Sequence, residues 1–84
     1  MTITPKQSKA AREMLGWSRD DLQEVSKLGR ETIGNFEREI GNATARTLID
    51  LQRAFEGAGI EFTNNEKGEG VMLLRKKNKE PIPK

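Results

Sequence analysis

The chain has 84 residues, a length that predicts a single domain with a core of limited size. It contains no cysteine and no histidine, which excludes disulfides and the usual zinc sites, so we expect neither a metal nor a cofactor. Without cysteine, histidine or tyrosine, general catalysis falls to carboxylates and lysines, and these are scattered along the polar faces of the expected helices. The composition therefore argues against an enzyme.

The net charge of +2 is unevenly distributed along the chain. Residues 75–84 contain five basic residues and one glutamate, a net charge of +4, which leaves −2 for residues 1–74. A slightly acidic domain has little general attraction for nucleic acid. Any DNA-binding function must therefore depend on where individual cations lie.

The sequence indicates a cytoplasmic protein. Residues 1–5 lack the basic segment and apolar run of a secretion signal, and no stretch approaches the ~20 apolar residues needed to cross a bilayer. The absence of cysteine fits a reducing compartment.

A first helix is predicted from its capping residues and its apolar spacing. Thr4 is a suitable N-cap, Pro5 suits the first helical position, and Gly16 can end the helix in a left-handed conformation. The apolar residues at helical spacing are Ala10, Ala11, Met14 and Leu15. Trp17 follows between two helices, and we expect it in the core.

A second, short helix is predicted from Arg19 to Ser26. Ser18 is its N-cap, and Asp21 at the third helical position completes a capping box. Leu22 and Val25 are expected to face inward.

Residues 27–29 then turn the chain into a third helix, predicted from about Arg30 to Arg38. The apolar residues expected to pack it against the core are Leu28, Ile33 and Phe36. Gly34 lies in the interior of this helix, where glycine costs roughly 1 kcal/mol relative to alanine. We expect Gly34 to be exposed, with Arg30, Glu31 and Asn35 on the same outward side.

The remaining third of the chain changes character. Thr44 caps a fourth helix whose apolar residues are Leu48, Leu51, Ala54 and Phe55, and Gly57 or Gly59 stops it. The alternation of residues 60–63, a polar turn over 64–70 and the apolar run 71–74 predict a small hairpin. The expected divisions are a helix-turn-helix domain over 1–59, a β-hairpin over 60–75 and a basic flexible tail over 76–84.

With these elements placed, the chain resembles the lambda-repressor-like, or XRE, helix-turn-helix family over about Thr4 to Gly59. The residues that carry the resemblance are Ala10-Ala11-Arg12, Leu15-Gly16-Trp17-Ser18, Leu22, Val25, Thr32-Ile33, Phe36-Glu37-Arg38, Thr44 and Thr47-Leu48. The resemblance implies a mainly α fold, a lambda-repressor-like bundle of about four helices with a helix-turn-helix. A small C-terminal β-hairpin is expected to follow it.

Three positions depart from the family pattern. Lys27 and Glu39 stand where glycine is usual, and Gly29 stands where a serine or threonine usually caps the recognition helix. Gly41 is expected to serve in place of the glycine missing at 39. Glycine is an acceptable N-cap, so we expect these departures to weaken local stability without changing the fold.

In this family the second helix of the motif enters the major groove, which implies that the helix over residues 30–38 reads bases. Arg30 can contact guanine and Asn35 adenine, each with two hydrogen bonds. Glu31 either accepts from a cytosine amino group or orients Arg30, and Thr32 touches a thymine methyl or a phosphate. The alternative is that all four are ordinary solvated residues.

Other polar residues are expected to contact the DNA backbone or to hold the helices. Phosphate contacts are predicted for Arg19, Arg38, Asn42 and Arg46, although Arg46 is equally well a solvated surface residue. Arg12 and Glu37 resemble the two partners of a structural ion pair that joins the first helix to the recognition helix. The basic tail either follows a phosphate backbone or only solvates the chain end.

The hairpin suggests assembly into a homodimer. One of its faces, with Ile60, Phe62, Val71 and Leu73, is expected to cover the helices, which leaves Met72 and Leu74 on the other face beside an unpaired edge. The alternative is a lone hairpin. Together these features predict a transcriptional repressor that binds double-stranded DNA at a palindromic operator. The alternative function is an antitoxin or adaptor that uses the same fold mainly to bind a partner protein.

Overall fold

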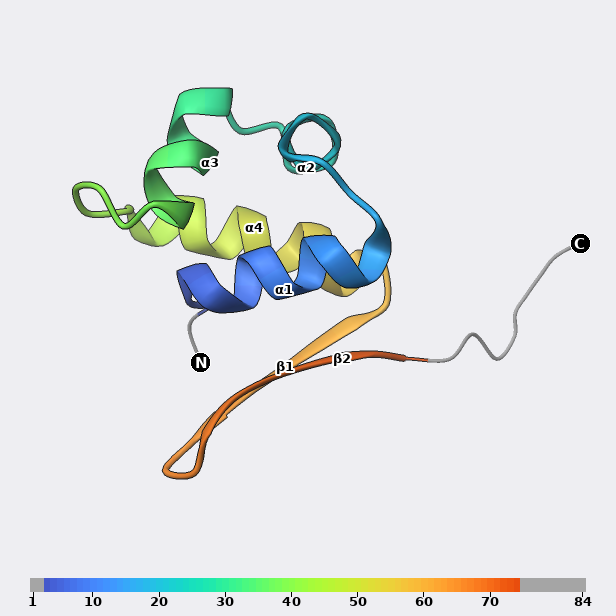
Figure 1. The fold of residues 1–84 in the computed structure, drawn as a ribbon. Coiled ribbons are helices and arrows are strands. Elements are labelled where there is room, and N and C mark those ends of the chain that lie inside the picture. Colours follow the sequence, from blue (N-terminus) through green and yellow to red (C-terminus); the bar gives the residue numbers. More distant parts are fainter. Residues whose placement is uncertain (1–2, 75–84) are drawn as a thin grey trace, which may run out of the picture.

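The computed structural model describes residues 3–74, and in this part of the chain four helices precede a two-stranded antiparallel hairpin (Figure 1). The elements are α1 (Pro5–Leu15), α2 (Arg19–Ser26), α3 (Arg30–Glu37), α4 (Ala45–Gly57), β1 (Ile60–Asn65) and β2 (Gly68–Leu73). The mainly α bundle with a C-terminal hairpin is confirmed. The predicted basic tail over 76–84 lies outside the described residues.

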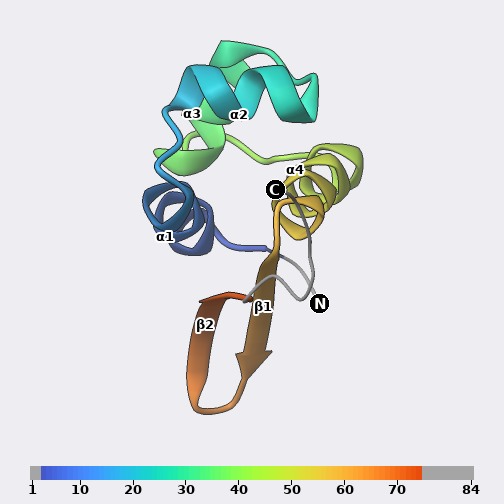
Figure 2. The same cartoon turned by 90° about the vertical axis from the view of Figure 1, so that its right-hand side faces the viewer.

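The helices form two layers, with the hairpin on one side. In Figures 1 and 2, α2 and α3 lie on one side of α1 and α4, and β1 and β2 lie on the opposite side. The longest helix within residues 3–74, α4, has 13 residues, and none of the helices there has the length and apolar content that crossing a bilayer requires.

The helices begin where the capping residues predict. Ser18 accepts a hydrogen bond from the Asp21 amide at 3.1 Å while the Asp21 side chain accepts from the Ser18 amide, so the predicted capping box is confirmed. Thr4 and Thr44 cap α1 and α4 in the same way through the amides three residues on. Each cap contributes about 1 kcal/mol because it pairs an amide that the helix leaves free.

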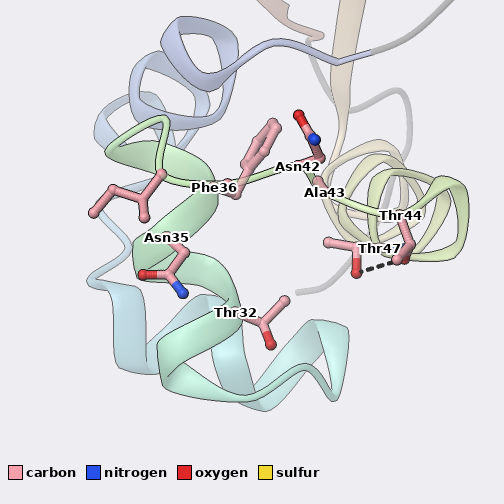
Figure 3. A pocket seen from close by; sticks show the side chains of 9 residues that line it. Thr32, Asn35, Phe36, Asn42, Ala43, Thr44 and Thr47 are labelled. Atoms are coloured by element: carbon pink, nitrogen blue, oxygen red, sulfur yellow. Dashed lines mark hydrogen bonds between the residues drawn. The ribbon is translucent and has the colours of Figure 1, made fainter.

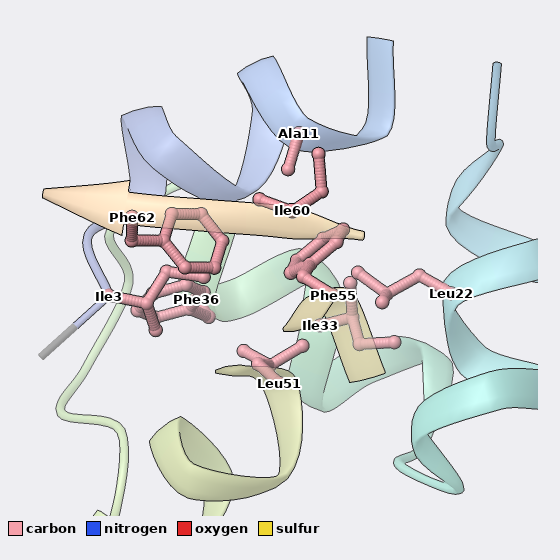
Figure 4. Packing of buried hydrophobic residues seen from close by; sticks show 9 residues of the cluster. All are labelled: Ile3, Ala11, Leu22, Ile33, Phe36, Leu51, Phe55, Ile60 and Phe62. Atoms are coloured by element: carbon pink, nitrogen blue, oxygen red, sulfur yellow. The ribbon is translucent and has the colours of Figure 1, made fainter. Parts of the chain in front are cut away.

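The core lies where the two helix layers and the hairpin meet (Figure 4). Its buried apolar residues are Ile3, Ala11, Leu22, Ile33, Phe36, Leu51, Phe55, Ile60 and Phe62. The ring of Trp17 stacks on Phe55 with centroids 5.8 Å apart, and Phe62 packs in a T-shaped arrangement against the Phe55 ring. Trp17 therefore packs against the core as expected, although it is itself only partly buried. The inward position of Ile3, before the first helix, was not predicted.

Two helical residues lie on the opposite side from the one predicted. Val25 was expected inward but is 49% exposed, because α2 turns Leu22 and Ser26, four residues apart, toward the protein instead. Gly34 was expected to be exposed but is buried. The Arg38 side chain folds back over it, and a Cβ at Gly34 would lie 2.8 Å from Arg38 Nη2.

The strands of the hairpin are longer, and its turn shorter, than the apolar residues predict. Pairing runs from Ile60 opposite Leu73 to Asn65 opposite Gly68, so the turn is only residues 66–67 rather than the predicted 64–70. Backbone pairing does not require apolar side chains, which is why the polar stretch was misread as a loop. Leu73, predicted to be inward, is 43% exposed at the end of its strand.

A buried polar side chain fixes the hairpin to α1. Gln7 is only 1% exposed, and its Nε2 donates to the carbonyl oxygens of Thr63 at 3.1 Å and Gly70 at 2.9 Å. Its Oε1 accepts from the Thr4 amide and from Asn64. Because a buried amide is costly unless its hydrogen bonds are made, these contacts determine where the hairpin lies on the bundle.

The two departures from the family glycines carry a conformational cost. Lys27 and Glu39 have φ values of 66° and 61°, and they are the two non-glycine residues with positive φ among residues 3–74. Lys27 ends α2 and Glu39 follows α3, so both positions keep the left-handed conformation without the residue that best tolerates it. Gly41 is also left-handed, at φ 70°. We expected it to take over the left-handed position after α3, but Glu39 itself occupies that position, so this expectation was wrong.

We predict that Lys27→Gly and Glu39→Gly each stabilise the domain by ~0.5–1 kcal/mol, because the left-handed strain removed exceeds the added freedom of the unfolded chain. Urea unfolding followed by circular dichroism measures the change. Gly16→Ala is the matched control, since Gly16 is left-handed at φ 72° with no atom within 4 Å of an added Cβ. The free energy of unfolding of Gly16→Ala should be about 1 kcal/mol lower than that of the wild type, because alanine tolerates the left-handed conformation less well than glycine does. Unchanged stability in both glycine variants would contradict the prediction.

Candidate nucleic-acid interface

The helix α3 presents a polar surface while its other side is buried. Ile33, Phe36 and Glu37 are buried, whereas the side chains of Arg30, Glu31 and Thr32 are exposed and Asn35 is half-buried. A helix of eight residues does not persist alone, so its position depends entirely on what the buried side contacts. The four residues predicted to contact bases therefore lie on one helix, and the contacts of its buried side determine its orientation.

The buried carboxylate of Glu37 is the main polar contact behind α3. Arg12 binds it with two hydrogen bonds, from Nη2 to Oε1 at 2.7 Å and from Nε to Oε2 at 2.9 Å, so Arg12 and Glu37 form an ion pair between α1 and α3. Ser8 donates its hydroxyl to Oε2 at 2.5 Å, and Arg19 donates Nε to Oε1 at 3.3 Å. Glu37 itself is fully buried.

These partners keep the carboxylate charged. Burial by itself raises the pKa of the Glu37 carboxyl. The hydrogen bonds from Arg12 and Ser8 act in the opposite direction, and so do the positive charge of Arg12 and the hydrogen bond from Arg19. Together they lower the pKa of Glu37 below the ordinary value for a glutamate.

At the start of α3, Arg30 is paired with a residue of α2. Its Nη2 lies 2.8 Å from Oδ1 of Asp20, and both side chains are well exposed, at 74% and 68%. An exposed pair of this kind contributes little to stability, but it restricts where the guanidinium points. The carboxylate that contacts Arg30 is therefore that of Asp20 rather than that of Glu31.

A groove runs between α3 and the first turn of α4 (Figure 3). It has a volume of about 300 Å³ and brings Thr32 and Asn35 of α3 to the same surface as Asn42 of the following loop. Its other side is formed by Thr44, the N-cap of α4, and by Thr47 in the first turn of that helix, and a hydrogen bond of 3.1 Å joins the two hydroxyls. Candidates for base contact and for phosphate contact thus line one groove.

The predicted phosphate contacts fall into different surroundings. Arg19 is the first residue of α2 and is partly committed to Glu37, with 38% of its side chain exposed. Arg38 is exposed and lies over Gly34, beside the end of α3. Arg46 is 81% exposed and pairs with Asp50 one turn later at 3.3 Å, an arrangement typical of a solvated helix surface.

Two residues of this interface were not predicted from the sequence. Ser8 lies one helical turn before Arg12 on the same side of α1, so the spacing alone pointed to it as a second donor to the carboxylate. Asp20 had no such signal, because it is ten positions from Arg30 and meets it only once α2 and α3 are packed together.

The fold and this arrangement define a class of protein, the helix-turn-helix DNA-binding regulators. A model of the helix-turn-helix family matches residues 9–59, a segment that contains α2 and α3. The chain belongs to the XRE-type helix-turn-helix family, as the sequence resemblance implied. A search of curated proteins found no match.

We predict that Glu37→Ala destabilises the domain by ~3–5 kcal/mol at neutral pH, because it leaves the partly buried charge of Arg12 without its partner. The milder Glu37→Gln should show the pH dependence. The stability due to the charged carboxyl is present above the unfolded pKa of about 4.3 and is lost as the pH falls through the lower folded pKa. The gap in melting temperature between wild type and Glu37→Gln should therefore stay constant down to about pH 5 and then narrow.

Differential scanning calorimetry across this pH range makes the measurement. Glu24→Gln, which changes an exposed glutamate on α2, is the control and should follow the wild type throughout. A Glu37→Ala variant with the wild-type melting temperature would show that the ion pair does not hold α3.

Proposed function

We propose that this DNA-binding regulator is a transcriptional repressor that acts by occupying a palindromic operator as a homodimer. The observation that carries the proposal is the surface of α3, where Arg30, Glu31, Thr32 and Asn35 are accessible while the opposite side is fixed by Glu37. A recognition helix needs this division, because base contacts are specific only if the helix has one fixed orientation.

The four accessible residues have the chemistry for reading base edges. In the proposed complex Arg30 donates to the O6 and N7 atoms of a guanine, and Asn35 pairs with the N6 and N7 atoms of an adenine. Glu31 accepts from a cytosine amino group, and Thr32 contacts a thymine methyl or a phosphate. Arg19, Arg38, Asn42 and Arg46 are proposed to contact the backbone on either side of these bases.

We predict that Asn35→Ala weakens binding to the operator by roughly 5- to 150-fold, the equivalent of one lost two-bond contact to a base. Its melting temperature should stay near that of the wild type, because Asn35 is not part of the buried side of α3. Selection from a random DNA pool first supplies the operator, and fluorescence anisotropy then measures the affinity.

The control for this prediction is Gln52→Ala, because within residues 3–74 the hydrogen bond of the Gln52 side chain is to Glu56 on the same helix. It should bind as the wild type does. If Asn35→Ala kept both the wild-type affinity and the wild-type sequence preference, the assignment of Asn35 to a base would fail.

The homodimer is proposed on the basis of the hairpin. Within residues 3–74 the sheet has two strands, so each strand has one edge with no neighbouring strand. Met72 and Leu74, the predicted interface residues, are 54% and 44% exposed, and Leu73 between them is exposed as well. Pairing two copies along the free edge of β2 would cover Met72 and Leu74, which lie on the face away from the helices, and would present two copies of α3 to DNA.

We predict that Met72→Lys shifts the protein toward monomer without loss of stability, because the charge is placed in the interface but not in the core. Multi-angle light scattering at tens of micromolar measures the mass. Met14→Lys is the matched control, since Met14 is a comparably exposed methionine on α1 at 46%. It should leave the mass unchanged, and a wild-type protein of monomeric mass would contradict the dimer.

A second candidate function rests on the same apolar surface. In an antitoxin or adaptor, Met72, Leu73 and Leu74 would contact a partner protein rather than a second copy. The two functions differ in their DNA dependence. A repressor selects a sequence with two inverted half-sites from a random pool, and it loses affinity steeply as salt rises. An adaptor selects no sequence and forms a stoichiometric protein complex.

A further inference from the structure

Arg19 lies between the surface that is proposed to contact DNA and the buried carboxylate of Glu37. It is the first residue of α2, and 38% of its side chain is exposed. Its Nε donates to Oε1 of Glu37 at 3.3 Å, the longest of the four hydrogen bonds that this carboxylate accepts. Its two Nη groups have no hydrogen-bond partner within residues 3–74.

A guanidinium group is planar and rigid, so the direction of one edge determines the direction of the other. With Nε on Glu37, the direction of the Nη edge of Arg19 is set by the buried carboxylate of α3. Arg12 cannot take this role, because its Nε and Nη2 bind Glu37 and its Nη1 donates to the carbonyl of Trp17 at 3.3 Å.

We propose that Arg19 is a positioning residue that couples a DNA phosphate to the orientation of the recognition helix through Glu37. In the complex its Nη groups bind the phosphate while its Nε stays on the carboxylate. The phosphate, Arg19, Glu37 and α3 then form one continuous chain of contacts. This inference rests on the proposed DNA-binding function and adds to it, because the backbone contact now depends on a buried residue of α3.

The bridge depends on the shape of the side chain as well as on its charge. Lysine at position 19 keeps the charge for the phosphate, but its single ammonium cannot offer two fixed edges. Arg19→Lys should therefore bind the selected operator about 5- to 150-fold more weakly, the usual range of a coupling between two sites, with an unchanged salt slope. Arg19→Gln should in addition lower that slope by about 0.9, because a phosphate contact is lost.

A double-mutant cycle separates coupling through Glu37 from a merely local effect. In a Glu37→Gln background the carboxylate that Arg19 holds is gone, so the penalty of Arg19→Lys should disappear. Arg46→Lys is the matched control, because Arg46 is also an arginine paired with a carboxylate, but with Asp50 rather than Glu37. Its effect on affinity should be equal in the two backgrounds. Anisotropy titrations are made at a temperature where circular dichroism shows every variant folded.

The same bridge has a spectroscopic signature that does not need the Glu37 variant to fold. The Nε–H resonance of Arg19 in ¹⁵N-labelled protein should be sharper and slower to exchange in the operator complex than in the free protein. A resonance lost on adding DNA would overturn the proposal, and so would Arg19→Lys binding with wild-type affinity. A penalty for Arg19→Lys that is equal in both backgrounds would overturn it as well. Each of these outcomes leaves the proposed function intact, whereas a wild-type protein that selects no DNA sequence contradicts both.

Discussion

The structure depends on a single buried carboxylate. Glu37 lies on the recognition helix and accepts hydrogen bonds from Ser8 and Arg12 of α1 and from Arg19 of α2. A buried charge is costly unless its partners are well placed, so the three elements can pack in only one relative arrangement without leaving it unpaired. The apolar contacts of α3 are less selective in direction. The apolar contacts bury most of the surface of α3, while the carboxylate determines how α3 is oriented relative to α1 and α2.

The helix α1 carries two sets of buried polar contacts on successive residues. Gln7 binds two carbonyl groups of the hairpin, and Ser8 together with Arg12 binds the carboxylate of α3. The proposed interface for a second copy and the proposed interface for DNA are therefore both positioned from the same helix. In a dimer formed through the hairpin, the distance between the two recognition helices would be determined by these polar contacts, and with it the spacing of the half-sites.

Few cations are available for the proposed DNA contacts of this domain. Residues 1–74 carry a net −2, so attraction must come from cations at particular places rather than from a general field. Three of the cations proposed to contact DNA are already paired with carboxylates: Arg30 with Asp20, Arg19 with Glu37 and Arg46 with Asp50. These contacts reduce the local charge, but they also reduce the freedom of three long side chains. A preorganised arginine loses less entropy when it binds, which favours specificity over raw attraction.

Much of the fold was readable from local features of the sequence. The caps at Thr4, Ser18 and Thr44 and the apolar spacing gave four helices with correct starts, because capping and periodicity depend on residues within one or two turns. The prediction for Val25 was wrong because its outcome depended on neighbours far along the chain. Val25 and Ser26 are equally placed to follow Leu22 inward, and only the packing of α2 against α3 and α4 decided for Ser26.

The sequence by itself determined the family and the helices, and it supplied the residues that are proposed to contact DNA, since these follow from residue types at fixed spacings. Only the tertiary structure decided how those residues are used. It placed the carboxylate of Asp20 against Arg30, and it brought Arg19 to Glu37 across 18 positions of sequence. No local pattern records such contacts, because a hydrogen bond between side chains of different helices exists only after the helices have packed.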